Sequence, residues 1–145
     1  MGLLEFLNTI YVGDRGCKSL IINTWNCEVK MQLTCISRVR SKAWDYYDTE
    51  DLPNGFIVFE DVNSIIINPL GAMPNDTING IHAEAISDGA GKYLVKVNVD
   101  SVNDCGKRTE VEIQIIAGSM ALEAYGAADK RIPQSTGLTR RLHFR

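Results

Sequence analysis

The segment AWDYYDTEDLPNGFIVFED, residues 43–61, contains six carboxylates and no basic residue, and its first half carries three aromatic rings. Trp and Tyr are favoured anchors of protein interfaces, and acids beside them attract a basic partner. A loop that precedes a rigid strand is a usual place for a binding surface. We therefore expect a partner-binding surface formed by Trp44, Asp45, Tyr46, Tyr47, Asp48, Glu50 and Asp51. The alternative is a lid, in which Trp44 and one Tyr fold back onto the core.

Signals for enzymatic chemistry are weak. His82 and Glu84 are two residues apart, which on a strand places them on one face, where a base and its orienting acid would lie. A base also needs a nucleophile or a substrate pocket, and the sequence has no Gly-x-Ser-x-Gly, phosphate-loop or His-Glu-x-x-His motif. We interpret the pair as polar residues on the solvent side of a sheet. We expect no enzyme, no catalytic residue and no cofactor.

Metal binding is not expected either. The acids at 45–51 lack the ligand alternation and central glycine of an EF-hand loop. The cysteines at 17, 27, 35 and 105 form no Cys-x-x-Cys pair, which argues against a zinc site. We expect reduced thiols, with Cys35 as a small buried hydrophobic residue.

Hydrophobic periodicity sets the expected elements. Leu3, Phe6, Leu7 and Ile10 share one face of a short helix, which the glycines of GDRG at 13–16 end. Period-two alternation or β-rich composition then predicts strands over 18–24, 28–37, 56–60, 64–68, 79–87, 92–101 and 108–117. Turns are expected at 25–27, 88–92 and 103–107. Residues 119–124 extend the last strand or form one helical turn.

The expected fold is mainly β: an antiparallel β-sandwich or barrel of about seven strands with one short N-terminal helix. The run SIIIN at 64–68 predicts a strand buried on both faces. Strand alternation places the core at Met31, Leu33, Ile66, Val95, Val97, Val111, Ile113 and Ile115.

Charge divides the chain into an acidic body and a basic tail. Residues 1–128 hold 10 Lys/Arg and 17 Asp/Glu, a net of −7, whereas 129–145 carry a net of +4. We expect one β-rich domain over 1–125 and a basic C-terminal tail over 126–145, whose removal from residue 127 leaves stability nearly unchanged. Phosphate repulsion argues against nucleic acid as the partner of the acidic body. Arg140, Arg141 and Arg145 with Phe144 are a small basic cluster that we interpret as a solvated tail.

The N-terminal residues MGLLEFLNTIY have no basic residue before their apolar part, unlike a signal peptide, and no apolar run approaches the ~18 residues of a membrane span. We expect a cytoplasmic protein without a membrane partner.

The stretches GDRGCKS, CISRVR, GFIVFEDVNSI and TEVEIQII resemble those of small uncharacterised bacterial proteins. In size, acidity and strand content the chain is similar to the immunity or accessory proteins of polymorphic toxin systems. The resemblance implies a bacterial source and a compact β-rich fold, and it supplies no catalytic residues to carry over.

The expected function is therefore a non-enzymatic bacterial protein that binds another protein, as an immunity-type antitoxin blocks a basic toxin. One alternative is a small-molecule-binding β-barrel with Trp44, Tyr46 and Tyr47 at its mouth. Another is a structural subunit, or homo-oligomer, that assembles through its sheet edges.

Overall fold

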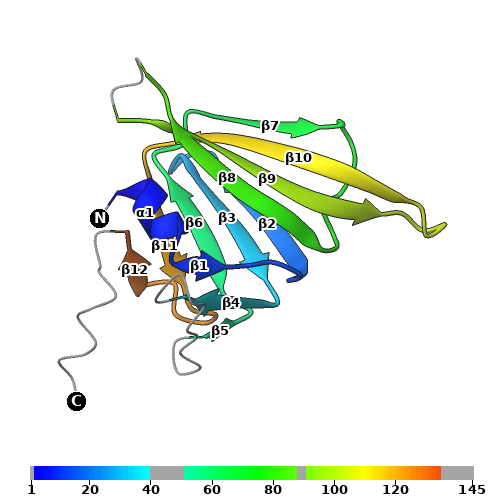
Figure 1. Cartoon of the computed structure of the whole chain (residues 1–145), viewed down its shortest axis with the longest axis horizontal. Coiled ribbons are helices and arrows are strands. Elements are labelled where there is room, and N and C mark those ends of the chain that lie inside the picture. Colours follow the sequence, from blue (N-terminus) through cyan, green and yellow to red (C-terminus); the bar gives the residue numbers. More distant parts are fainter. Residues whose placement is uncertain (1, 40–50, 88–90, 135–145) are drawn as a thin grey trace.

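A computed structural model describes residues 2–39, 51–87 and 91–134. The fold is mainly antiparallel β-structure, with one short helix at one side of the strands (Figure 1). The elements are α1 (Leu3–Leu7), β1 (Ile10–Tyr11), β2 (Cys17–Asn23), β3 (Glu28–Leu33), β4 (Cys35–Arg38), β5 (Leu52–Pro53), β6 (Phe56–Glu60), β7 (Ser64–Asn68), β8 (Ile78–Ala85), β9 (Tyr93–Val102), β10 (Arg108–Ala117), β11 (Ser119–Glu123) and β12 (Arg131–Pro133). The expectation of a mainly β, antiparallel fold with one N-terminal helix is confirmed.

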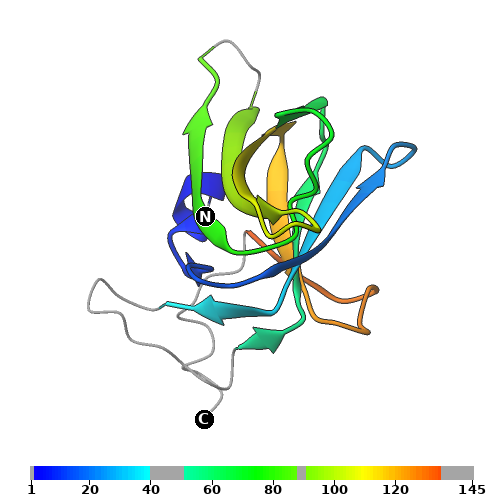
Figure 2. The same ribbon diagram turned by 90° about the vertical axis from the view of Figure 1, so that its right-hand side faces the viewer.

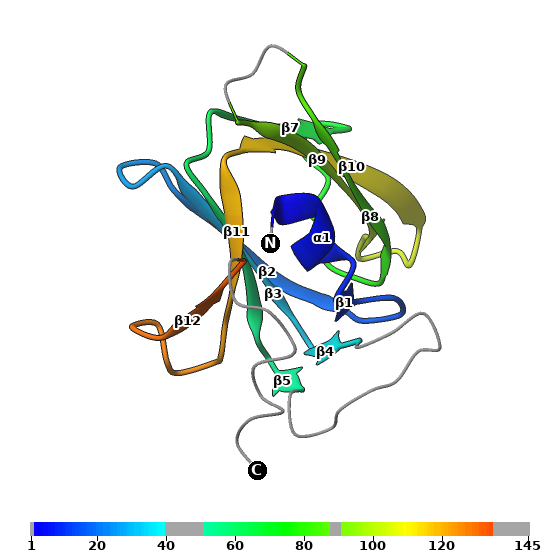
Figure 3. The ribbon, with the colours of Figure 1, turned by 60° about the vertical axis from the view of Figure 1, so that its left-hand side comes forward.

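Two larger sheets form the body. The five-stranded sheet has the order β12-β11-β6-β3-β2, and the four-stranded sheet has the order β7-β10-β9-β8. A small third sheet, β1-β4-β5, lies at one end. The inward residues of both larger sheets belong to one hydrophobic cluster. Figure 3 shows α1 between the two sheets, on the side where they are open.

The chain passes from one sheet to the other at a shared corner. β6 and β11 pair in the five-stranded sheet, while β7 and β10, which directly adjoin them in sequence, pair in the four-stranded sheet. At the corner the Gly118 N–H lies 3.0 Å from the Glu60 carbonyl oxygen and 3.2 Å from that of Asp61. A Cβ atom at Gly118 would lie 2.7 Å from Oδ2 of the exposed Asp61 side chain, so a larger residue here would require that side chain to move. On the other side an isolated bridge joins Gly16 to Thr77, and the sheets do not close into a barrel.

The helix packs as expected but is shorter. Leu3, Phe6 and Leu7 are buried, and the helix contacts β8 and β11. The prediction that Ile10 lies on the same helical face is wrong: Ile10 is buried, but in β1, opposite Arg38 of β4. Helix and strand can both bury this residue, so its apolar character did not determine where the helix ends.

The predicted core is correct except at one position. Met31, Leu33, Val95, Val97, Val111, Ile113 and Ile115 have no exposed surface. Ile66 is 54% exposed, because β7 pairs with β10 so that Ile65 and Ile67 face the core instead. β7 is therefore not buried on both faces.

Two strand assignments also change. The expected single strand over 28–37 is two strands, β3 and β4, separated at Thr34, whose N–H donates to the Gly16 carbonyl. Residues 119–123 form β11 rather than a helical turn. The turn at 103–107 is confirmed, with Asn103 Oδ1 accepting the N–H groups of Cys105 and Lys107. The turn expected at 88–92 includes 88–90, which lie outside the described residues.

The C-terminal region differs most from expectation. Apolar periodicity ends near Gly126, yet Arg131–Pro133 forms β12 at the edge of β11, with Arg131 opposite Glu123. The Gln134 side chain also accepts the Met120 N–H at 2.8 Å. The prediction of an undocked segment is thus wrong for 131–134, because Arg131 forms ion pairs with the sheet and Ile132 packs against the hydrophobic core. Residues 135–145 lie outside the described residues.

The cysteines are free thiols, with Cys17 buried, Cys27 and Cys105 exposed and Cys35 only half-buried, so Cys35 is less buried than predicted. Among the described residues, no helix has both the length and the apolar character that crossing a membrane requires.

Candidate protein-binding site

The loop predicted from sequence as the interface lies mostly outside the described residues, which exclude Trp44, Asp45, Tyr46, Tyr47, Asp48 and Glu50. Asp51 is described: it precedes β5, is half-buried, and its Oδ1 is buried without a hydrogen-bond partner among the described residues. β5 pairs with β4 in the small sheet. The loop therefore joins two strands of that sheet, and its role as an interface stays a prediction.

His82 and Glu84 are both exposed on β8, on the face away from the core. In the part of the chain that the structure describes, no three His, Cys, Asp or Glu side chains gather as a metal site would require. Neither observation supplies a catalytic arrangement.

The tip of the β2–β3 hairpin presents a different surface, built from polar turn residues. Asn23 Oδ1 accepts the Asn26 N–H at 3.2 Å, and the Thr24 carbonyl accepts the Cys27 N–H at 3.3 Å. Cys27 has a positive φ of 52°, which lets the chain reverse before β3 begins at Glu28. The predicted turn at 25–27 is confirmed.

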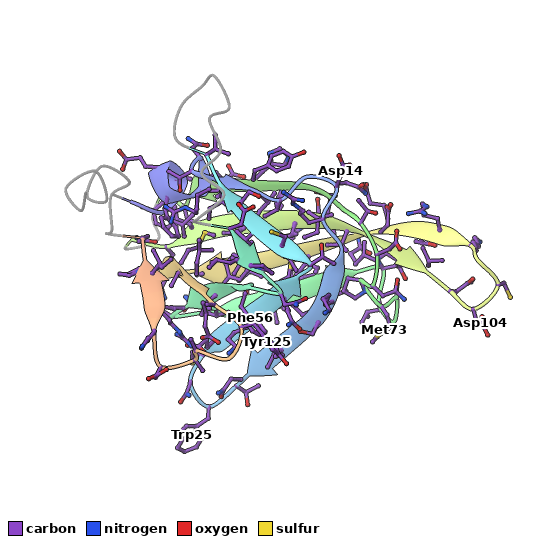
Figure 4. All side chains as sticks on the ribbon, turned by 90° about the horizontal axis from the view of Figure 1, so that it is seen from below. Asp14, Trp25, Phe56, Met73, Asp104 and Tyr125 are labelled. Atoms are coloured by element: carbon purple, nitrogen blue, oxygen red, sulfur yellow. The ribbon has the colours of Figure 1, made fainter. Side chains whose placement is uncertain are left out.

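Trp25 projects from this turn into solvent. Trp25 is 93% exposed, and Figure 4 shows its ring pointing away from the body of the protein. Figure 2 shows that the hairpin itself extends beyond the rest of the sheet. Trp usually buries most of its surface, so an outward ring on a short turn is typical of an interface anchor. The signal in the sequence is a Trp inside a turn between two strands, a pattern that predicts the turn but not the exposure of the ring.

An open groove of about 240 Å³ lies beside the hairpin tip. Its apolar walls are Ile22 and Val29 of the hairpin and Val62 and Ile65 of the β6–β7 segment. The Val62 N–H donates to the Cys27 carbonyl at 2.8 Å, which fixes the two walls together. Ile22 has the inward orientation of its strand and lies opposite the buried Val29, but it is 46% exposed. We call Trp25 and this groove the hairpin site.

Charged side chains brace the outer face of the five-stranded sheet next to the hairpin site. Arg131 forms a bidentate ion pair with Glu28, in which Nη1 donates to Oε2 at 2.7 Å and Nη2 donates to Oε1 at 2.9 Å. Its Nη1 also donates to Glu60 at 3.1 Å, and its Nε to Glu123 at 3.1 Å. Glu28 begins β3 and lines the groove, and Glu60 ends β6, directly before the β6–β7 segment. Arg131 therefore links the two strands from which the walls of the groove are formed.

This cluster contains a nearly buried carboxylate. Glu123 is only 2% exposed, and its Oε2 accepts a hydrogen bond of 2.7 Å from the Lys30 ammonium group. Lys30 in turn lies 4.6 Å from the centre of the Phe56 ring. Hydrogen bonds from Arg131 lower the pKa of Glu28, and those to Glu28 raise the pKa of Arg131. Both groups therefore stay charged at neutral pH, and the cluster acts as a fixed support.

Fold and site together define a class: an antiparallel β protein with two larger sheets and one small sheet, which displays an aromatic hairpin beside an apolar groove. The chain belongs to a family of unknown function, DUF6258, whose family model matches residues 1–134. Comparison with curated proteins and with solved structures returned no match. The matched region includes β12, so the docked strand lies within the part that the family shares.

Proposed function

We propose that this protein is a non-enzymatic bacterial protein that binds another protein, in particular an immunity-type antitoxin that blocks a basic toxin. The observation that carries the proposal is the nearly full exposure of Trp25 beside the groove of Ile22, Val29, Val62 and Ile65. A large ring exposed next to an apolar concavity stabilises the free protein little. It would contribute binding free energy when a partner covers it.

The shape of the site favours a protein over a small molecule. Small-molecule pockets enclose roughly 300–1,000 Å³ and surround the ligand. The groove here is smaller, at about 240 Å³, and open. The inward residues of the sheets, such as Val97 and Ile113, are fully buried against one another. The small-molecule barrel therefore has less support than a protein partner.

The charge of the chain supports a basic partner. Residues 1–128 have a net charge of −7, and the 43–61 segment carries six acids without one base. Such a field speeds the approach of a positively charged protein and repels nucleic acid. A nuclease toxin must attract phosphate and is expected to be basic, so an acidic inhibitor can cover its site. The cytoplasm, where such a toxin would act, is the location that this proposal implies.

The test uses the purified, catalytically inactivated product of the gene directly upstream as the binding probe. We expect it to be basic and to bind the full chain. Trp25→Ala should weaken binding by about 2 kcal/mol or more, roughly 30-fold, chiefly by faster dissociation. The melting temperature should not change, because the ring is exposed. Tyr125→Ala, which removes an exposed ring elsewhere on the surface, is the matched control and should bind normally.

A second set of variants separates the hairpin site from the acidic loop. Changing Asp45, Asp48, Glu50 and Asp51 to Asn or Gln should slow association, and less so at high salt, if the loop steers the partner. Trp44→Ala or Tyr47→Ala should speed dissociation if the loop is an anchor. If the neighbouring product does not bind the wild-type chain, the antitoxin proposal is wrong. If it binds and Trp25→Ala has no effect while Trp44→Ala does, the interface is the loop.

A further inference from the structure

The exposed edges of the two larger sheets differ in how they are protected against pairing with another strand. β12 has three residues and ends in Pro133. β2 has a register shift between Cys17 and Ser19, with Lys18 between them. β8 has a register shift between Ile78 and Gly80 and displays Glu84. Short length, proline, bulges and charges are the usual devices that prevent edge-to-edge association.

β7 has none of these devices. It pairs with β10 in unbroken register from Ser64 opposite Ile116 to Asn68 opposite Glu112. No charged residue occurs from Val62 to Asn75. Ile66 is 54% exposed on the outer face, and Figure 1 shows β7 at the rim of its sheet. A regular, uncharged, β-branched edge strand is a site for strand addition.

The alternation of hydrogen bonds along β10 determines which N–H and C=O groups of β7 point to its free edge. The Asn103 N–H donates to the Lys107 carbonyl, in register with the β9–β10 pairing, so odd-numbered residues of β10 bond to β9. Even-numbered residues then bond to β7, and Gln114 pairs with Ile66. The N–H and C=O groups of Ile65 and Ile67 therefore point to the free edge of β7.

We propose that this edge pairs with β7 of a second copy of the chain, antiparallel, about a two-fold axis at Ile66. In this register Ile65 of each copy lies opposite Ile67 of the other. These are the residues whose backbone groups face the edge, so each pair exchanges two hydrogen bonds. Ser64 lies opposite Asn68, and the two Ile66 side chains meet at a close, non-hydrogen-bonded position on the outer face. The sequence Ser-Ile-Ile-Ile-Asn is self-complementary about its centre, as a two-fold interface requires.

Electrostatics favour the same edge. Two copies with a net charge of −3 each repel, and their acidic bodies repel more strongly. The charge-free segment from 62 to 75 brings no carboxylate into the contact, whereas β8 would bring Glu84 of both copies toward it. The groove of the hairpin site shares Ser64 and Ile65 with β7, whereas Trp25 lies on the β2–β3 turn and Ile66 does not line the groove, so substitutions at Trp25 and Ile66 test binding and dimerisation separately.

The association is tested by sedimentation equilibrium of the full chain over a range of concentrations. We expect a reversible monomer–dimer equilibrium, and Ile66→Lys should raise the dimer dissociation constant about tenfold or more. The control is Ile21→Lys, which places the same charge on the exposed face of the protected edge strand β2 and should leave the equilibrium unchanged. A wild-type chain that stays monomeric up to roughly 1 mM would overturn the proposal. So would equal effects of the two variants.

The register is tested by disulfide trapping, with the exposed Cys27 and Cys105 changed to Ser. Ile66→Cys should form a cross-linked dimer on mild oxidation, since the two positions face each other across the axis. Asn68→Cys should not, because each position 68 lies opposite Ser64 of the other copy. Efficient cross-linking by Asn68→Cys and none by Ile66→Cys would show a different register and overturn this arrangement.

Discussion

Arg131 and Glu28, 103 residues apart in sequence, are joined by two parallel hydrogen bonds of 2.7 and 2.9 Å between guanidinium and carboxylate. This pair connects the last described strand to the first residue of β3, next to the turn of the β2–β3 hairpin. It also places a cation between three carboxylates, of which Glu123 is nearly buried. The support of the hairpin site therefore depends on a residue far from it in the chain.

The Arg131 cluster should stabilise the fold in a pH-dependent way. Arg131→Met should lower the free energy of unfolding by about 1–3 kcal/mol at pH 7, because it leaves Glu123 with fewer partners. The pKa of Glu28 is lowered in the folded state, so its share of the stabilisation is complete above its ordinary pKa of 4.5 and is lost as the pH falls. Urea unfolding of both proteins from pH 7 to 3 should show the difference shrinking. Lys130→Met, at the exposed neighbouring residue, is the control.

The docking of β12 reverses the sequence-based expectation for the C-terminal region. Removing residues 127–145 deletes β12 and Arg131, and should now lower the melting temperature by about 5 °C or more, the equivalent of roughly 1 kcal/mol or more. A chain ending at Gln134 keeps every described contact of β12 and is the matched comparison. Equal melting temperatures of the 1–126 and 1–134 chains would show that β12 contributes no stability.

Two isoleucines test the assignment of inward and outward positions. Ile113→Ala should cost about 2–5 kcal/mol, because the side chain is fully buried between the sheets. Ile66→Ala, on the neighbouring strand but facing outward, should change stability by about 0.5 kcal/mol or less. Denaturant unfolding at low protein concentration measures both. Similar losses for the two variants would contradict the observed orientation of β7.

The thiols should differ sharply in reactivity. Burial raises the pKa of Cys17 to about 11, so almost no thiolate is present at pH 8. Cys27 and Cys105 are exposed and should be alkylated by iodoacetamide within the same time that leaves Cys17 unmodified. Peptide mass spectrometry of folded and urea-unfolded protein gives the comparison. Rapid labelling of Cys17 in the folded protein would contradict its burial.

The inward and outward faces of the alternating strands were predictable, because apolar and polar side chains alternate along them. In β9 and β10 the apolar residues Val95, Val97, Val111 and Ile113 alternate with polar ones, and only one register buries them all. β7 has three successive isoleucines, so alternation cannot choose between Ile66 and its neighbours. Pairing with β10 made that choice, and it also left β7 as an edge. Likewise, the position of Ile10 in the sequence fits both a helical and a strand pattern. Only its pairing with β4 in the folded protein decides that it lies in a strand.

The sequence by itself determined the mainly β class, the inward faces of its alternating strands and the acidic charge, because these depend on residue type and local spacing. The tertiary structure alone decided which surface is hollowed and which segment is docked. The groove arises where the hairpin and the β6–β7 segment meet at the margin of the shared core, and no local pattern marks it. Arg131 docks because Glu28, Glu60 and Glu123 converge from three strands, an arrangement that only the folded sheet creates.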